Sequence, residues 1–113
     1  MHKPYSLRRL QGLDAKLQRL SYFEQRFPGL VREAKADLLM TCLGAMQGCL
    51  RSLNGEEMDA ARKKMNEIMT QITPLEIPEG TPAKRKLLLK AAGKHLEQTA
   101  RILNFLIDIL LLT

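Results

Sequence analysis

The feature that most constrains the fold is a run of thirteen residues without a charge, Leu38 to Leu50 (LLMTCLGAMQGCL), in a chain of which 27% is charged. A helix that is apolar on nearly every side is buried on nearly every side. This run is therefore predicted to lie in the central helix of a domain or of an oligomer. Within it, Gly44, Ala45 and Gly48 would allow another helix to approach closely.

Turn and capping residues divide the rest of the chain into helices. Pro28-Gly29 and Asn54-Gly55 are stop signals, and Thr81-Pro82 is an N-cap followed by proline at the first helical position. Ser6 is a suitable N-cap for the first helix. We expect helices at about 6–27, 30–53, 56–72 and 82–111, with 73–81 as the linker.

Two of these helices carry apolar stripes with helical spacing. The stripe of the third helix alternates steps of three and four residues, which is a heptad seam. The stripes comprise Leu10, Leu13, Leu17, Leu20 and Phe27 in the first helix, and Met58, Ala61, Met65, Ile68, Ile72 and Leu75 from the third helix onward.

The supply of apolar residues favours helices over strands. The chain has five aromatic residues and a single valine, so the core must be built from Leu, Ile, Met and Ala. Helices joined by short connections favour antiparallel packing. The sequence predicts one all-α domain over residues 1–113, a compact antiparallel bundle of about four helices with a long C-terminal helix.

The cysteines and the apolar segments bear on where the protein acts. Cys42 and Cys49 are about 10 Å apart along a helix, too far to bond to each other, and are predicted to be reduced core thiols. Met1–Arg9 is not followed by the apolar core of a signal peptide. Ile102–Leu112 is too short to span a bilayer. We expect a cytoplasmic protein without a membrane partner.

Motifs for catalysis and metal binding are not found in the sequence. There is no CxxC, HxxxH, HExxH or GxSxG motif, and His95 is the only histidine beyond position 2. Glu56, Glu57 and Asp59 match the acidic first turn of a helix. The sequence therefore predicts no catalytic residue, metal, cofactor or small-molecule substrate, and a protein that is not an enzyme.

Positive charge is concentrated in two segments of the chain. Residues 1–35 carry eight Lys or Arg against three acidic residues, and residues 82–101 carry six against one. If the two segments pack side by side, they form one basic face that would attract phosphates or an acidic partner. The predicted nucleic-acid-binding residues are Arg8, Lys16, Arg19, Arg26, Lys84, Arg85, Lys86, Lys90 and Lys94.

The outline of a basic four-helix bundle of this size is similar to two kinds of accessory protein. One is the small helical subunit of RNA-guided CRISPR effector complexes, and the other accompanies the reverse transcriptases of diversity-generating retroelements. The resemblance covers helix number, helix lengths and charge, and no residue is carried over from it. The leading hypothesis is a non-enzymatic accessory subunit that binds nucleic-acid backbone through the basic face, with little sequence preference, within an oligomer or larger complex.

The apolar C-terminal run supports a second hypothesis. Phe105, Ile109 and Leu112 project from a different side of the predicted helix than Leu103, Leu106 and Leu110. A small bundle would bury one of these stripes and leave the other partly exposed, which indicates an interface. The alternative function is therefore a protein-binding regulator, an antiactivator or adaptor, that docks through this helix onto a larger partner. Self-association through the same helix stays open.

Overall fold

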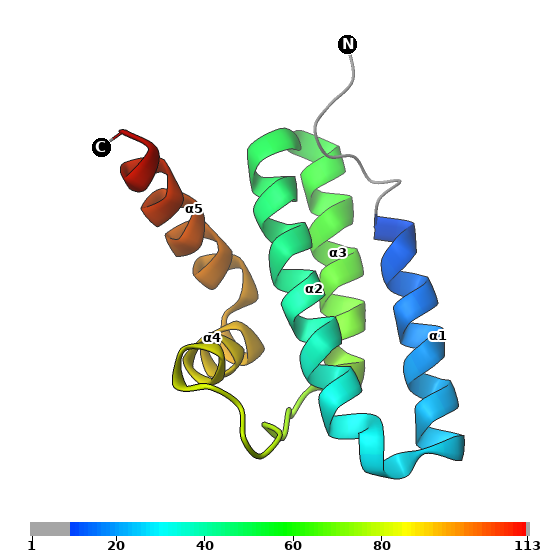
Figure 1. The fold of residues 1–113 in the computed structure, drawn as a ribbon. Helices are drawn as coiled ribbons and strands as arrows, with labels where there is room; N and C mark the ends of the chain where they lie inside the picture. The colour runs from blue at the N-terminus through cyan, green and yellow to red at the C-terminus, as the bar shows by residue number, and fades with distance from the viewer. Residues whose placement is uncertain (1–9, 113) are drawn as a thin grey trace.

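In a computed structural model, residues 10–112 are described and form five α-helices and one 3-10 turn (Figure 1). No strand occurs in this part of the chain, so the predicted all-α bundle is confirmed. The predicted helix start at Ser6 lies outside the described residues. In chain order the elements are α1 (Gln11–Arg26), the 3-10 turn η2 (Pro28–Leu30), α2 (Val31–Ser52), α3 (Gly55–Ile72), α4 (Ala83–Lys94) and α5 (Leu96–Leu112).

Helix α2 is the centre of the bundle, as its uncharged run predicts. It contacts α1, α3, α4 and α5, and Leu39, Cys42 and Cys49 have no exposed surface. Close approach of a second helix at Gly44 is not observed, because this glycine is exposed and a Cβ built on it would meet nothing within 4 Å.

The connections on either side of α2 form where the stop signals predict them. After α1 the chain turns through Pro28–Leu30, and α2 and α3 are separated by only two residues. Gly55 has φ +58°, in the left-handed region that glycine adopts at little cost. This turn brings α3 back along α2, so the two helices lie side by side (Figure 1).

The heptad seam of α3 is confirmed. Met58, Ala61, Met65, Ile68 and Ile72 are all buried. Leu75, beyond the helix, is half-buried and packs against the same core. The stripe of α1 is buried at Leu10, Leu13 and Leu20, whereas Leu17 is half-buried and Phe27 is 48% exposed where the chain turns.

The predicted long helix from Pro82 to Leu111 is wrong in its middle, because the helix breaks at His95. This residue has φ −142° and ψ 72°, and its N–H still bonds to the carbonyl of Ala91 as the last contact of α4. Helix α5 then begins afresh, with the N–H and the hydroxyl of Thr99 both donating to the His95 carbonyl. Gly93, a weak helix former, lies two residues before the break.

The break changes how the C-terminal region packs. Helix α4 contacts both α2 and α5, and α5 turns from the direction of α4 to run alongside α2, in the same direction as α2 (Figure 1). A single straight helix could not follow α2 in this way. The predicted N-cap at Thr81 is also not formed, since its hydroxyl donates to the carbonyl of Pro78 and α4 begins after Pro82.

Candidate interaction surface on α5

The first half of α5 is fixed to the bundle by its apolar face. Leu96 and Thr99 are buried, and Ala100 has no exposed surface. Leu103, one turn further on, is half-buried and packs against the core. Together these four residues cover one side of the helix, because they are spaced at three, one and three residues.

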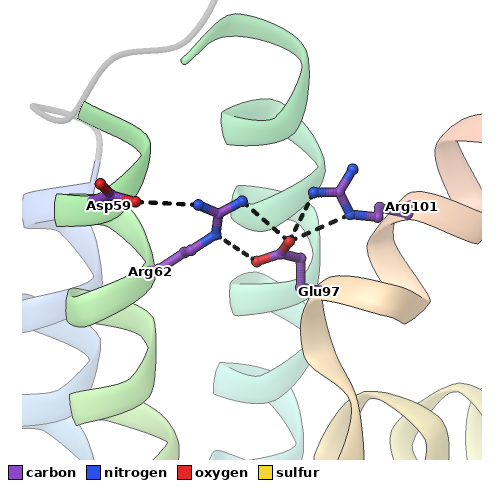
Figure 2. Close-up of polar contacts among 4 residues, drawn as sticks. All are labelled: Asp59, Arg62, Glu97 and Arg101. Carbon is purple, nitrogen blue, oxygen red and sulfur yellow. Dashed lines mark hydrogen bonds and ion pairs between the residues drawn. The ribbon is translucent and has the colours of Figure 1, made fainter. Parts of the chain in front are cut away.

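The polar edge of α5 faces the bundle as well. The Arg62 side chain of α3 forms a two-pronged contact with Glu97, with Nε–Oε1 at 2.9 Å and Nη2–Oε2 at 3.3 Å (Figure 2). Arg101 donates to the same carboxylate at 2.8 Å, and Asp59 accepts from Arg62 at 3.2 Å. The bond from Arg62, followed by that from Arg101, holds the pKa of Glu97 below its ordinary value.

Further along α5, two more polar residues bond to α2. Asn104 accepts from the Gln47 side chain and donates to the Gln47 carbonyl, both at 3.2 Å. Asp108 accepts from Arg51 at 2.8 Å. Glu97, Asn104 and Asp108 therefore lie on the side of α5 that meets its neighbours, and this polar edge is in contact with α2 and α3.

The second half of α5 consequently presents apolar side chains to solvent. Every residue from Phe105 to Leu112 is exposed, although seven of these eight residues are apolar. The exposed fraction ranges from 41% at Ile109 to 87% at Leu112. The expectation that only one apolar stripe is exposed is wrong, because Leu106 and Leu110 are exposed too. A patch of this kind is uncommon on a monomeric protein and marks an interface.

The exposed side chains include a heptad seam. Ile102, Phe105, Ile109 and Leu112 are spaced at three, four and three residues and lie within one stripe of the helix. The seam of α3 has the same kind of spacing and is buried inside the bundle. Among the described residues, nothing covers the seam of α5 in the same way.

The predicted basic residues do not form one face. Helices α1 and α4 lie on opposite sides of α2 and α3 (Figure 1), so the condition of side-by-side packing is not met. On α1, Lys16 bonds to Asp37 at 3.4 Å and to Thr41 at 3.0 Å, and Arg26 lies over the Tyr22 ring at 5.8 Å. Arg19 is exposed. Arg8 lies outside the described residues.

The cations of α4 are grouped on one helix. All five are exposed, and no acidic side chain within residues 10–112 forms an ion pair with them. Three of them fall at four-residue intervals and so lie along one line of the helix. The five residues are Lys84, Arg85, Lys86, Lys90 and Lys94.

The two thiols are buried in α2, as predicted for core cysteines. Neither forms a disulfide. Burial raises the pKa of Cys42 from 9.0 to about 12, against a smaller lowering by Lys16, and burial also raises the pKa of Cys49. Such thiols are poor nucleophiles because the thiolate is the reactive form.

Residues 10–112 contain neither a candidate metal cluster nor a candidate membrane span. No group of three or more His, Cys, Asp or Glu side chains that could hold a metal ion occurs within residues 10–112. None of the described helices has the length and apolar character needed to cross a membrane.

Comparisons with known protein families, with curated proteins and with solved structures find no match for this chain. The class of protein is therefore described from its own fold and surfaces. It is an all-α bundle in which the second half of the last helix is an exposed apolar surface.

Sequence reasoning identified Phe105, Ile109 and Leu112 but missed Ile102 as the first member of the seam. The heptad spacing of three, four and three residues was the signal that could have found it. The inward-facing polar edge of α5 was also missed. Its partners Gln47, Arg51 and Arg62 belong to other helices, so no local pattern reveals the pairing.

Proposed function

We propose that this chain is a non-enzymatic assembly subunit that associates with a second copy of itself through the seam of α5. The observation that carries the proposal is the uninterrupted exposure of residues 105–112 in a segment with one charged residue. Covering exposed apolar surface of this kind with another apolar surface stabilises the complex by ~25 cal/mol per Å² of surface removed from water. The surface therefore favours association over the monomer.

The pattern of the surface indicates that the covering element is a helix. A seam with heptad spacing packs into the holes formed by a facing helix, and the covered seam of α3 is an example within this bundle. Stable interfaces bury on the order of 800 Å² per partner. The four side chains of the seam are each at least 41% exposed, and Leu106 beside them adds to the apolar surface that such an interface would bury.

Charge is compatible with a second copy as the partner. Beyond Arg101 the helix carries only Asp108, and its carboxylate is bonded to Arg51. The five unpaired cations of α4 lie away from the exposed seam, so two seams can meet without these like charges opposing each other. A symmetric dimer places the same patch on both copies, which a self-complementary apolar seam fulfils.

Substitution of two seam residues tests the proposal. We expect the wild-type chain to be a dimer or larger oligomer by light scattering, and the double variant Phe105→Glu, Ile109→Glu to be a folded monomer. Both side chains are exposed, so the change removes the interface while leaving the core intact. Circular dichroism checks that the helix content is retained.

The matched control is Leu30→Glu with Leu87→Glu. These residues are also exposed apolar side chains, at 50% and 70%, and the substitutions make the same change in net charge. The control variant should keep the oligomeric state of the wild type. A wild-type chain that stays monomeric at every concentration would contradict self-association. The protein-binding regulator, docking through the same helix onto a different protein, would then be the better proposal.

The hypothesis of nucleic-acid binding stays a prediction, and it now depends on α4 alone. The α1 cations lie on the other side of the bundle (Figure 1). Titration of the protein with short single- and double-stranded DNA and RNA at two salt concentrations tests it, since phosphate binding falls steeply with salt. Absence of binding at low salt would leave α4 without a role in nucleic-acid binding.

A further inference from the structure

A groove on the described surface lies between the linker after α3 and the helix α4. Its volume is about 810 Å³. Leu75 and Ile77 of the linker and Leu89 of α4 form an apolar floor, and three lysines of α4 line the other side. No acidic and no aromatic residue is among those that line it.

The wall formed by the linker is held in place. Glu76 forms an ion pair with Arg32 of α2 at 2.7 Å, on the side of the linker away from the groove. The neighbouring Leu75 and Ile77 pack against the core of the bundle. At the start of the linker, the Thr73 hydroxyl donates to the carbonyl of Met69 at 2.6 Å. The groove is therefore bounded by a linker with contacts on both faces.

The three lysines form a regular row along the groove. Lys86, Lys90 and Lys94 are spaced four residues apart, so the row extends about 12 Å along α4. All are exposed, and none is paired with an acidic side chain of residues 10–112. The row is therefore free to pair with negative charge from outside the described part of the chain.

The geometry points to this groove as a docking site for an acidic, amphipathic helical segment of a partner protein. Apolar side chains of the segment would cover Leu75, Ile77 and Leu89. Carboxylates spaced four residues apart on the segment would pair with the row of lysines, because side chains at that interval share one helix face. Such a complex would follow a known mode of peptide recognition, in which an amphipathic helix binds in an apolar groove.

Two other occupants fit the groove less well. Nucleic-acid backbone would pair with the lysines but leave the apolar floor unused, and the lining has no aromatic side chain on which a base could stack. A small molecule is usually held in a pocket that buries most of its surface, whereas Pro74 and the three lysines are exposed. The site does not depend on α5, since no residue of α5 lines it.

A peptide selection tests the proposal with the full-length protein. A displayed library of random helical peptides is selected on the wild-type chain, after removal of peptides that bind the variant Lys86→Glu, Lys90→Glu. Because that variant retains α5, this step discards peptides that bind the seam. We expect the recovered peptides to combine Asp or Glu at four-residue intervals with apolar residues on one face.

The affinity of the recovered peptides is then measured against variants with equal changes in charge. Lys86→Glu with Lys90→Glu should weaken binding about tenfold or more, since two attractive pairs become repulsive. Lys84→Glu with Arg85→Glu, on the same helix but outside the groove, should leave the affinity within about twofold.

Several results would overturn the assignment. Recovery of no peptide that depends on the lysines would do so, as would recovered peptides without acidic residues or an equal loss in the control variant. Fluorescently labelled DNA and RNA oligonucleotides serve as competitors. If an oligonucleotide binds more tightly than the best peptide and also depends on Lys86 and Lys90, the groove serves phosphates instead.

Discussion

The chain contains two long runs of apolar residues, and the fold treats them in opposite ways. In the run from Leu38 to Leu50 of α2, only Gly44 is exposed. In the run from Ile102 to Leu112 of α5, no residue is buried. Both runs have the composition of a core helix, so composition alone does not decide which of them lies in the core.

The difference arises from the neighbours that each run acquires. Helix α2 contacts all four of the other described helices, α1, α3, α4 and α5. Helix α5 is the last element, and its polar edge takes the contacts with α2 and α3 through Glu97, Asn104 and Asp108. The apolar side chains of its second half are left exposed. An apolar run thus predicts that something covers it without specifying whether the cover is internal.

The largest expected effect is a difference between the two runs in how far truncation of a leucine lowers the free energy of unfolding. Leu39→Ala in α2 should lower the free energy of unfolding by about 2–5 kcal/mol, because Leu39 has no exposed surface and a cavity would remain. Leu111→Ala in α5, where the residue is 81% exposed and lies off the seam, should change it by less than about 0.5 kcal/mol. Urea unfolding measures both. Similar losses in the two variants would contradict the comparison.

A second prediction concerns pH and the buried run. The folded protein keeps Cys42 protonated to a pKa of about 12, whereas an exposed thiol ionises near 9.0. The raised pKa means that the folded state has its full stability below pH 9.0. This stability falls as the pH rises from 9.0 to about 12, because the unfolded chain loses the Cys42 proton first. The contribution is at most ~1.4 kcal/mol per pH unit.

Comparison with Cys42→Ala isolates this contribution, because lysines and tyrosines also lose protons at high pH. The free energy of unfolding should fall more steeply with rising pH in the wild type than in the variant. Equal slopes would mean that the Cys42 thiol reaches water in the folded state, and that the run in α2 is less enclosed than its exposed fraction indicates.

The smallest expected effect concerns the attachment of α5. Glu97→Gln weakens the contacts with Arg62 and Arg101, so amide hydrogen exchange in α5 should become faster while exchange in the middle of α2 stays unchanged. The lowered pKa of Glu97 stabilises the wild type above the ordinary carboxyl pKa, and this contribution is lost as the pH falls. The two proteins should therefore converge in stability at acidic pH. Unchanged exchange in α5 would show that Glu97 does not fix the helix.

Much of the fold follows from local patterns in the sequence. The uncharged run, Pro28-Gly29 and Asn54-Gly55 predict α2 and its two turns, and the heptad spacing predicts the buried face of α3. The break at His95 was not predicted, because the polar positions 86, 90, 94, 97, 101, 104 and 108 keep helical spacing across it. Gly93 is the one local signal, and a single glycine does not require a break.

The surfaces were less predictable because they depend on which helices are neighbours. The basic residues of α1 and α4 looked equivalent in sequence, yet the helices pack on opposite sides of α2 and α3 (Figure 1). The groove combines a linker with α4, and the contact of Glu76 with Arg32 that holds its wall joins residues far apart in the chain. Exposure of Phe105 and Ile109 was predicted, since their spacing separates them from Leu103.

The measurement that tests the central claim most directly is the distance between spin labels on two copies of the chain. A label at Leu111→Cys, beside the seam, can be attached selectively because Cys42 and Cys49 are buried. We predict a short intermolecular distance that disappears when Phe105→Glu and Ile109→Glu are added. A label at Lys63→Cys, exposed on α3, should give a longer distance or none. Absence of any intermolecular distance at position 111, in a protein whose α5 is folded, would contradict pairing through this helix.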